Sequence, residues 1–207
     1  MFRDRLDAAK QLADRLKSYR DKHPLILAIP RGAVPMAKII ADQLGGELDV
    51  VLVRKLRAPQ QLELAIGSVD ESGWTYLADY ARAYGGTADY IEAEKREQLA
   101  TLRQRRTKYT PLRPPISPTG RIVIVIDDGL ATGATMISAL HGLRAMKPAK
   151  LICAVPVAPP NTLAKVAELA DEVVCLEAPD FFQAVGQFYR DFTQVDDDEV
   201  IEILRRV

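Results

Sequence analysis

Two adjacent acidic residues followed by small and hydroxyl residues form the most chemically informative part of the sequence. The stretch reads Asp127-Asp128-Gly129-Leu130-Ala131-Thr132-Gly133-Ala134-Thr135 and follows the aliphatic run Ile122–Ile126. Paired carboxylates can hold sugar hydroxyls or orient the water shell of a Mg²⁺ ion. The small residues after them let backbone N–H groups curl around a phosphate, where the dipole of a following helix favours an anion. An acid pair followed by an anion cradle predicts a phosphorylated sugar as the ligand.

Basic residues follow two other predicted strands. Arg31 and Gly32 come after the apolar run 25–29, and Arg54 and Lys55 come after 49–53. Ligands of open α/β sheets bind beyond the carboxyl ends of the strands, so the three segments are expected to share one rim. Arg31 can neutralise an oxyanion, and glycine at position 32 permits unusual backbone conformations. Each basic segment alone is typical of a solvated strand end; together they indicate an anion site.

The elements that must position these residues alternate between helices and short buried strands. Helical spacing of apolar residues, short aliphatic runs and Gly/Pro punctuation predict helices over 2–19, 35–44, 87–109, 134–146 and 161–170, and strands over 25–29, 49–53, 121–126, 151–155 and 172–176. Residues 64–69 and 74–77 flank Asp70-Glu71-Ser72-Gly73, which predicts a hairpin turn. The fold class is therefore α/β with a parallel core of about five strands.

Composition limits the class of protein. The 207 residues include 28 Lys+Arg and 28 Asp+Glu, which excludes a globally basic nucleic-acid coat. The longest aliphatic run, Ile122–Ile126, is too short to span a membrane, and the first residues do not resemble a signal peptide. The only cysteines, Cys153 and Cys175, lie in apolar runs and lack metal-ligand spacing. We expect a cytoplasmic protein without disulfides.

Other phosphate-binding motifs and a purely structural role fit residues 127–135 less well. The sequence has no Gly-Lys-Ser/Thr ending of a P-loop and no Gly-x-Gly-x-x-Gly after the first strand. Asp127 and Asp128 could merely cap a turn, with the threonines capping a helix. That interpretation is disfavoured because several independent features coincide at one strand end.

Residues 122–135 resemble the phosphoribosyl-diphosphate motif of the type I phosphoribosyltransferases. The resemblance implies a parallel sheet flanked by helices, with a hairpin or lid insertion and a small hood from the termini. It also implies that Asp127 and Asp128 contact the ribose hydroxyls and, through water or those hydroxyls, Mg²⁺. Residues 129–135 would wrap the 5-phosphate, with Gly129 departing from the aliphatic residue usual in the family. The segments Arg31-Gly32 and Arg54-Lys55 would reach the diphosphate.

The same resemblance implies a single domain over residues 1–207. Its core would run from about 21 to 178, and its lid or hairpin from about 56 to 77. The terminal helix 1–20 and the C-terminal extension 179–207 are candidates for the hood.

The implied activity is transfer of a 5-phosphoribosyl group from phosphoribosyl diphosphate to a nitrogen acceptor, with release of diphosphate. A purine is the acceptor we expect, because Ala131-Thr132-Gly133 resembles the form seen in adenine phosphoribosyltransferases, whereas hypoxanthine-type relatives carry an aspartate at the position of Ala131. Phe181, Phe182 or Tyr189 could stack on a base, although clustered aromatics more often pack an extension onto the core. The sequence does not identify a general base. It also does not decide the oligomeric state, for which a homodimer is one candidate.

A second hypothesis concerns a cluster of basic residues near the end of the long predicted helix. It consists of Arg103, Arg105, Arg106, Lys108 and Arg113. Such a cluster could bind nucleic acid, and some relatives of the family are regulators that sense nucleotides without transferase activity. The alternatives are a solvated helix end whose cations suit the helix dipole, or a contact between subunits in which these cations meet the acidic tail. We favour the enzyme and do not expect nucleic acid as a partner.

Overall fold

Strand β6 (Ile122–Ile126) lies at the centre of a five-stranded parallel sheet, because its aliphatic side chains can be buried on both faces. The computed structural model describes residues 1–111 and 114–206. The sheet order is β2-β1-β6-β7-β8, with β1 (Leu25–Ala28), β2 (Glu47–Val50), β7 (Lys150–Val157) and β8 (Glu172–Glu177). The predicted parallel five-stranded core is confirmed. Arg113 lies outside the described residues.

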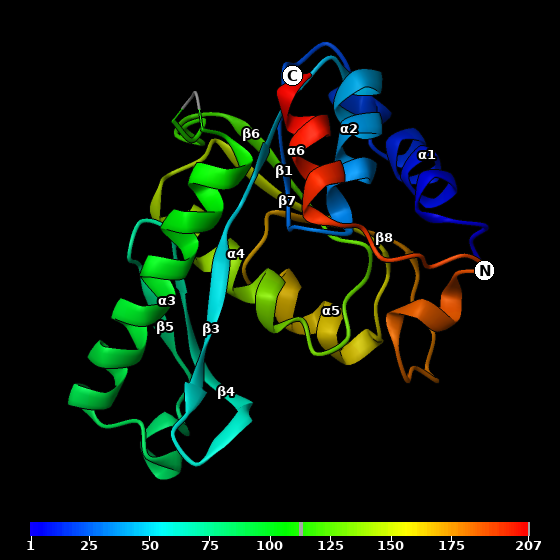
Figure 1. The fold of residues 1–207 in the computed structure, drawn as a ribbon. Coiled ribbons are helices and arrows are strands. Elements are labelled where there is room, and N and C mark those ends of the chain that lie inside the picture. The colour runs from blue at the N-terminus through cyan, green and yellow to red at the C-terminus, as the bar shows by residue number, and fades with distance from the viewer. Residues whose placement is uncertain (112–113, 207) are drawn as a thin grey trace.

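Helices cover both faces of this sheet (Figure 1). Ile124 and Ile126 of β6 belong to one apolar cluster with α1 (Arg5–Arg15) and α2 (Ala33–Leu44). The intervening Val123 and Val125 belong to a second cluster with α4 (Ala134–Ala145) and α5 (Pro160–Ala167). The C-terminal helix α6 (Asp197–Arg205) packs on α2 and on α3 (Ala88–Tyr109). Three short 3₁₀ segments complete the helices: Lys17–Tyr19, Ala81–Tyr84 and Val185–Phe188.

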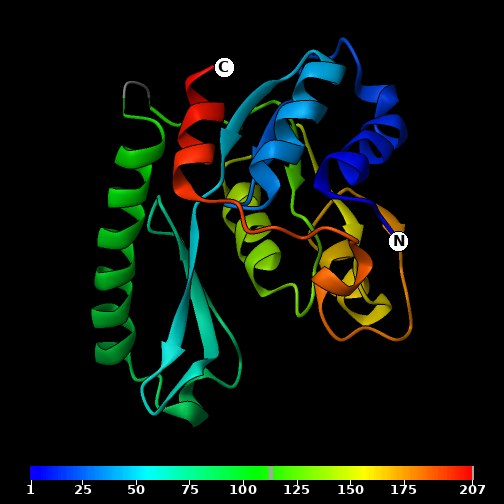
Figure 2. The same cartoon turned by 45° about the vertical axis from the view of Figure 1, so that its right-hand side comes forward.

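A second, antiparallel sheet forms a lobe beside the core together with α3 (Figure 2). Its strands are β3 (Val53–Ala58), β4 (Gln61–Asp70) and β5 (Thr75–Leu77). The turn predicted at residues 70–73 joins β4 to β5, and Asp70 Oδ1 accepts the backbone N–H of Trp74 at 3.0 Å. The rings of Trp74 and Tyr76 stack on His141 of α4, with centroid separations of 5.4 and 4.7 Å. The hairpin region is therefore packed against α4 in this structure.

The prediction of one strand over 49–53 is wrong at its C-terminal end. β2 ends at Val50, and Val53 already begins β3 of the other sheet. An uninterrupted aliphatic run carries no mark of the point where a chain passes from one sheet to another. As a result, Arg54 and Lys55 lie within a strand of the lobe rather than beyond the end of a core strand.

The N-terminal segment pairs with residues 188–191 of the C-terminal extension at the carboxyl-terminal edge of the core. Phe2 N–H donates to the Phe188 carbonyl at 2.8 Å, and Arg190 N–H donates to the Phe2 carbonyl at 2.9 Å. The ring of Phe2 also packs on Tyr189, with centroids 5.4 Å apart. The segments expected to form a hood thus lie together. Among the described residues, no helix combines the length and apolar character needed to cross a membrane.

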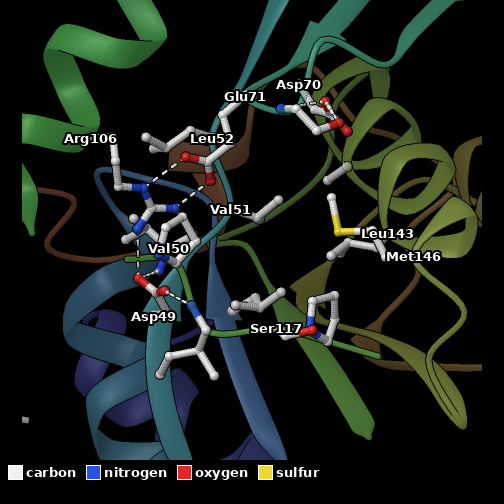
Figure 3. A pocket seen from close by; sticks show the side chains of 16 residues that line it. Asp49, Val50, Val51, Leu52, Asp70, Glu71, Arg106, Ser117, Leu143 and Met146 are labelled. Carbon is white, nitrogen blue, oxygen red and sulfur yellow. Dashed lines mark hydrogen bonds and ion pairs between the residues drawn. The ribbon is translucent and has the colours of Figure 1, made fainter. Parts of the chain in front are cut away.

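An ion-pair network around Arg106 joins the lobe to the core (Figure 3). The Arg106 side chain, only 12% exposed, pairs with Asp49 at the end of β2 and with Glu71 in the β4–β5 turn. Nη1 donates to Oδ1 of Asp49 and Nη2 to the carbonyl of Val50, both at 2.8 Å. Oδ2 of Asp49 accepts the backbone N–H of Ile116 at 2.9 Å. One guanidinium therefore connects α3, the β4–β5 turn and the end of β2.

The network predicts a large cost for removing the Arg106 guanidinium. Arg106→Ala is expected to lower the free energy of unfolding by about 3 kcal/mol or more, because two carboxylates would lose their shared cation in a buried site. Urea unfolding followed by circular dichroism measures this. Arg103→Ala, an exposed position on the same helix, should change stability by less than about 0.5 kcal/mol. Equal effects of the two variants would contradict the assignment.

Candidate active site

The acid pair lies at the carboxyl end of β6, and part of its oxygen surface is already used by the protein. Oδ1 of Asp127 accepts the backbone N–H of Asp128 at 2.9 Å. Oδ2 of Asp128 accepts a hydrogen bond from Nε of Arg5 at 2.8 Å and lies 2.8 Å from Nη2 of the same guanidinium in an ion pair. Within the described part of the chain, Oδ2 of Asp127 and Oδ1 of Asp128 have no hydrogen-bond or ion-pair partner. Each residue therefore has one carboxylate oxygen without a protein partner, its open oxygen.

Keeping these carboxyl groups charged costs the protein folding free energy. Burial, followed by the neighbouring Asp128 charge, raises the pKa of Asp127 well above its ordinary value. Burial also raises the pKa of Asp128, although the Arg5 guanidinium acts in the opposite direction. Hydroxyl donors or a cation at the two open oxygens would offset this cost. Strongly perturbed groups of this kind are typical of functional sites.

The residues after the acid pair form a tight loop that leads into α4. Gly133 precedes the helix with φ +74°, and a Cβ there would lie 2.7 Å from Cγ2 of Thr162. The Thr162 hydroxyl donates to the Ala131 carbonyl at 2.7 Å, and Leu130 N–H donates to the Val157 carbonyl at 2.9 Å. The loop is thus fastened to β7 and α5. Ala134 N–H donates to Oγ1 of Thr132 at 3.4 Å, and among the described residues the N–H groups of Thr135 and Met136 in the first turn of α4 have no protein acceptor.

The structure accounts for the glycine at position 129. Its φ is +154°, and a Cβ would lie 2.6 Å from Cγ1 of Val185 and 3.0 Å from Cγ1 of Val157. Val185 belongs to the C-terminal extension. An aliphatic side chain at position 129 would collide with that extension. Glycine replaces the usual aliphatic residue here because the C-terminal extension packs against this position.

A cationic cavity of about 230 Å³ lies between the loop and the lobe. Its lining consists of Pro30, Val53, Arg54, Lys55, Arg57, Arg105, Thr135 and Ser138. Across residues 1–111 and 114–206, none of its four cationic side chains makes an ion pair. Arg54 Nε donates instead to the neutral amide of Gln98 at 2.9 Å. Burial, followed by repulsion from Arg105 and Arg57, lowers the pKa of Arg54. Unpaired cations that repel one another constitute a site for a polyanion.

Sequence reasoning found Arg54, Lys55 and Thr135 in this cavity but missed Arg57 and Arg105. Arg57 fell in the segment assigned to the lid, and Arg105 was grouped with cations assigned to a helix surface. The available signal was the charge excess between Lys95 and Arg121, which holds eight basic residues against one acid.

The other predicted basic residue, Arg31, points elsewhere. Its Nη1 lies 3.8 Å from Oδ1 of Asp197 on α6, and Arg31 does not line the cationic cavity. The peptide bond between Pro30 and Arg31 is cis. Gly32 lies against the acid pair, because a Cβ at this position would overlap Oδ2 of Asp128. The loop after β1 thus contacts the acid pair through Gly32 and the cationic cavity through Pro30.

Two larger cavities continue along the same loop. One of about 470 Å³ lies between the loop and the antiparallel sheet and shares Lys55 and Ser138 with the cationic cavity. The next, of about 600 Å³, shares Thr132 and Lys165 with it. The apolar cavity of about 300 Å³ in Figure 3 is separate, since no residue of the 127–135 loop lines it. The connected series follows the predicted phosphate loop.

A metal ion at this site would depend on its ligand for most of its coordination. The described residues contain no cluster of three or more His, Cys, Asp or Glu side chains that could hold a metal. The open oxygens of Asp127 and Asp128 are hard donors of the kind that Mg²⁺ prefers, and Mg²⁺ commonly binds through one or two carboxylates, water and substrate phosphates. The acid pair therefore fits the predicted Mg²⁺ when a phosphorylated ligand is present.

Comparison with known proteins agrees with this geometry. The phosphoribosyl transferase domain model matches residues 4–193, which include the acid pair, the loop and the cationic cavity. The chain belongs to the phosphoribosyl transferase family. Its resemblance to the type I enzymes and their fold is confirmed.

Individual relatives within the family are similar over the whole chain. Two Mycobacterium tuberculosis proteins, from strains CDC 1551 and H37Rv and each named "Putative phosphoribosyl transferase", are 45% identical over 207 residues. The alignment covers 100% of this chain and 47% of each relative, so the chain spans about half the length of these curated relatives. The crystal structure of TT1426 from Thermus thermophilus has a TM-score of 0.88 and 43% identity, covering 99% of this chain and 98% of that chain.

The raised pKa of Asp127 predicts a variant that is more stable than the wild type. Asp127→Asn removes a buried charge, and its amide oxygen can still accept the Asp128 N–H. A carboxyl group whose pKa is higher in the folded than in the unfolded state costs folding free energy once the pH exceeds both values. We therefore expect Asp127→Asn to raise the free energy of unfolding near neutral pH. The gain should vanish below the ordinary Asp pKa of 3.8, where the wild-type group is protonated in both states.

Denaturant unfolding of both proteins across this pH range measures the difference. A loss of stability in Asp127→Asn near neutral pH, or a gain that grows toward acid pH, would contradict the assigned cost of the charge.

Proposed function

We propose that the chain transfers a 5-phosphoribosyl group from phosphoribosyl diphosphate to a nitrogen acceptor and releases diphosphate. The proposal rests on the groups found at the two ends of one loop: carboxylates at its start and a cluster of cations around its end. Open carboxylate oxygens stand at the start of residues 127–135, and Thr135 at the end lines a cavity of unpaired cations. A phosphorylated sugar bearing a diphosphate carries hydroxyls for the first and anionic groups for the second.

In this proposal the loop and the cations bind different parts of the ligand. The N–H groups of residues 131–135 bind the 5-phosphate at the start of α4. The open oxygens of Asp127 and Asp128 accept hydrogen bonds from the ribose hydroxyls. Arg54, Lys55, Arg57 and Arg105 bind the diphosphate through charge-assisted hydrogen bonds. Thr132 and Thr135 add hydroxyl donors to the phosphate sites.

The proposed reaction breaks the bond between the anomeric carbon and a diphosphate oxygen, and that electron pair leaves with the diphosphate. The lone pair of the acceptor nitrogen forms the new carbon–nitrogen bond, and the acceptor releases a proton. Negative charge grows on the leaving group, where the fixed cations of the cavity stabilise it. Positive charge develops on the sugar, which the carboxylates of the acid pair stabilise. The chain contributes mainly positioning and electrostatics.

Mg²⁺ is the proposed cofactor, held by Asp127 and Asp128 through water or the ribose hydroxyls. When bound, it would neutralise diphosphate charge as a Lewis acid. The protein's own residues then keep the sugar oriented between the acid pair and the cationic cavity, and the packed hairpin limits the access of water.

A purine base remains the proposed acceptor. The 600 Å³ cavity beside Ala131 and Thr132 is lined by an aromatic ring, Phe182, and by the polar side chains of Asn161 and Asp180. A flat heterocycle with hydrogen-bonding edges suits that lining. Tyr189 instead packs the C-terminal extension onto the core, because its ring is buried against those of Phe2 and Phe192.

The nucleic-acid hypothesis loses most of its support, because its cations have other partners. Arg106 pairs with Asp49 and Glu71, and Lys108 pairs with Asp197 at 2.7 Å. Arg105 lines the cationic cavity. The contact between the basic helix and the acidic tail, left open by the sequence, occurs within the chain through Asp197.

Ligand affinity tests the proposal. Phosphoribosyl diphosphate with Mg²⁺ should bind the wild type in calorimetric titration and raise its melting temperature, since it binds only the folded state. Arg105→Gln should weaken that binding about tenfold or more, because a hydrogen bond to a charged group contributes about 1.5–3 kcal/mol. Arg103→Gln, two residues away and exposed, is the matched control and should leave the affinity unchanged.

Catalysis is tested by a screen of nucleobases and small amines for diphosphate release. Release that requires one acceptor and disappears in Asp128→Asn would establish the transferase. Tight binding without release from any acceptor would overturn it in favour of a phosphoribosyl-diphosphate sensor, and no binding at all would overturn the ligand assignment.

A further inference from the structure

Arg5, in the first turn of α1, reaches the acid pair from a segment more than a hundred residues away in the chain. Both side chains of the Arg5–Asp128 pair are largely buried, with 12% and 17% exposure. Nε of Arg5 donates to one oxygen of Asp128, Oδ2, and Nη2 lies 2.8 Å from the same oxygen in the ion pair. Among the described residues, the other oxygen, Oδ1, has no protein partner.

The Arg5 guanidinium is itself held from the C-terminal side. Its Cζ lies 3.9 Å from the centroid of the Phe192 ring, a cation–π contact. Nη1 donates to the Thr193 carbonyl at 2.6 Å. The guanidinium is thus fixed by a carboxylate, an aromatic face and a carbonyl, and two of these three come from the C-terminal extension.

We infer that Arg5 is a positioning residue for the sugar site: it fixes the rotamer of Asp128 so that Oδ1 faces the ligand. The inference rests on the proposed function and goes beyond it, because it assigns a role to the N-terminal helix. Arg5 does not touch the ligand in this account and acts through Asp128.

The geometry requires the shape of arginine and not only its charge. A planar guanidinium can donate from Nε to a carboxylate and from Nη1 to the Thr193 carbonyl, keep Nη2 beside the same carboxylate oxygen, and still stack on Phe192. A lysine ammonium is a single point charge on a flexible stem and cannot meet these constraints together. Gly32 completes the arrangement, since a Cβ there would overlap Oδ2 of Asp128 and lie 3.0 Å from Nε of Arg5.

The main chain of Asp128 is also held in place. The Tyr189 hydroxyl donates to the Asp128 carbonyl at 2.7 Å. The side chain is therefore oriented by the N-terminal helix and the backbone by the C-terminal extension. The two segments that hold Asp128 also pair with each other, through Phe2 and Arg190.

The test measures the affinity for phosphoribosyl diphosphate with Mg²⁺ in Arg5→Gln, Arg5→Lys and a control. Arg5→Gln should weaken binding at least about tenfold, and Arg5→Lys should recover little of the loss, because the two-donor geometry is absent. Lys10→Gln, an exposed charge loss on the same helix, should change the affinity less than about twofold. Melting temperatures of the free proteins identify any variant that fails to fold.

Chemical rescue separates positioning from a purely structural role. In Arg5→Ala, millimolar guanidinium ion should restore part of the lost affinity, and methylammonium should not. In a double-mutant cycle, Asp128→Asn should remove most of the effect of Arg5→Gln. Unchanged or tighter binding in Arg5→Gln, full recovery in Arg5→Lys, or additive losses in the cycle would each overturn the inference. If the wild type itself does not bind the ligand, the proposed function fails instead.

Discussion

Arg106 connects the two sheets and so fixes the lobe, which carries the cations of the candidate site, against the core. Its guanidinium joins α3 to Asp49 at the end of β2 and to Glu71 in the β4–β5 turn. Arg54 lies on the strand that follows β2, and Arg105 is the neighbour of Arg106 on α3. The buried network therefore holds both sides of the cationic cavity against the loop after β6.

The candidate site contains negative and positive side chains whose charged forms are both destabilised by their surroundings. Burial and mutual repulsion raise the pKa of Asp127, and burial with repulsion from neighbouring arginines lowers the pKa of Arg54. Neither group improves the stability of the fold in this state. Stability is supplied elsewhere, by the aliphatic strands of the parallel sheet and by satisfied ion pairs such as Arg106–Asp49. Such a division is expected where a fold keeps charges ready for a ligand that carries the opposite ones.

Much of this arrangement was predictable from the sequence, because its signals are local. The run Ile122–Ile126, followed by two aspartates and small residues, predicted a central strand, which is confirmed, and the loop proposed to bind phosphate. The end of β2 was missed because the aliphatic run Val50–Val53 crosses between sheets without a break. Arg5, Arg57 and Arg105 were not assigned to the site for a different reason: their roles arise from tertiary contacts between distant segments. Arg105 does lie in a basic stretch, but such a stretch fits several roles. Gly129 was noticed as unusual, but only the position of Val185 explains it.

The central claim is that the loop 127–135 and the cationic cavity bind one ligand between them. A crystal structure of the chain with phosphoribosyl diphosphate and Mg²⁺ tests this most directly. The account predicts the 5-phosphate on the N–H groups at the start of α4, the ribose hydroxyls at Oδ2 of Asp127 and Oδ1 of Asp128, and the diphosphate between Arg54 and Arg105. A ligand bound in the separate apolar cavity of Figure 3, or one that leaves the acid pair without a ribose contact, would contradict the account.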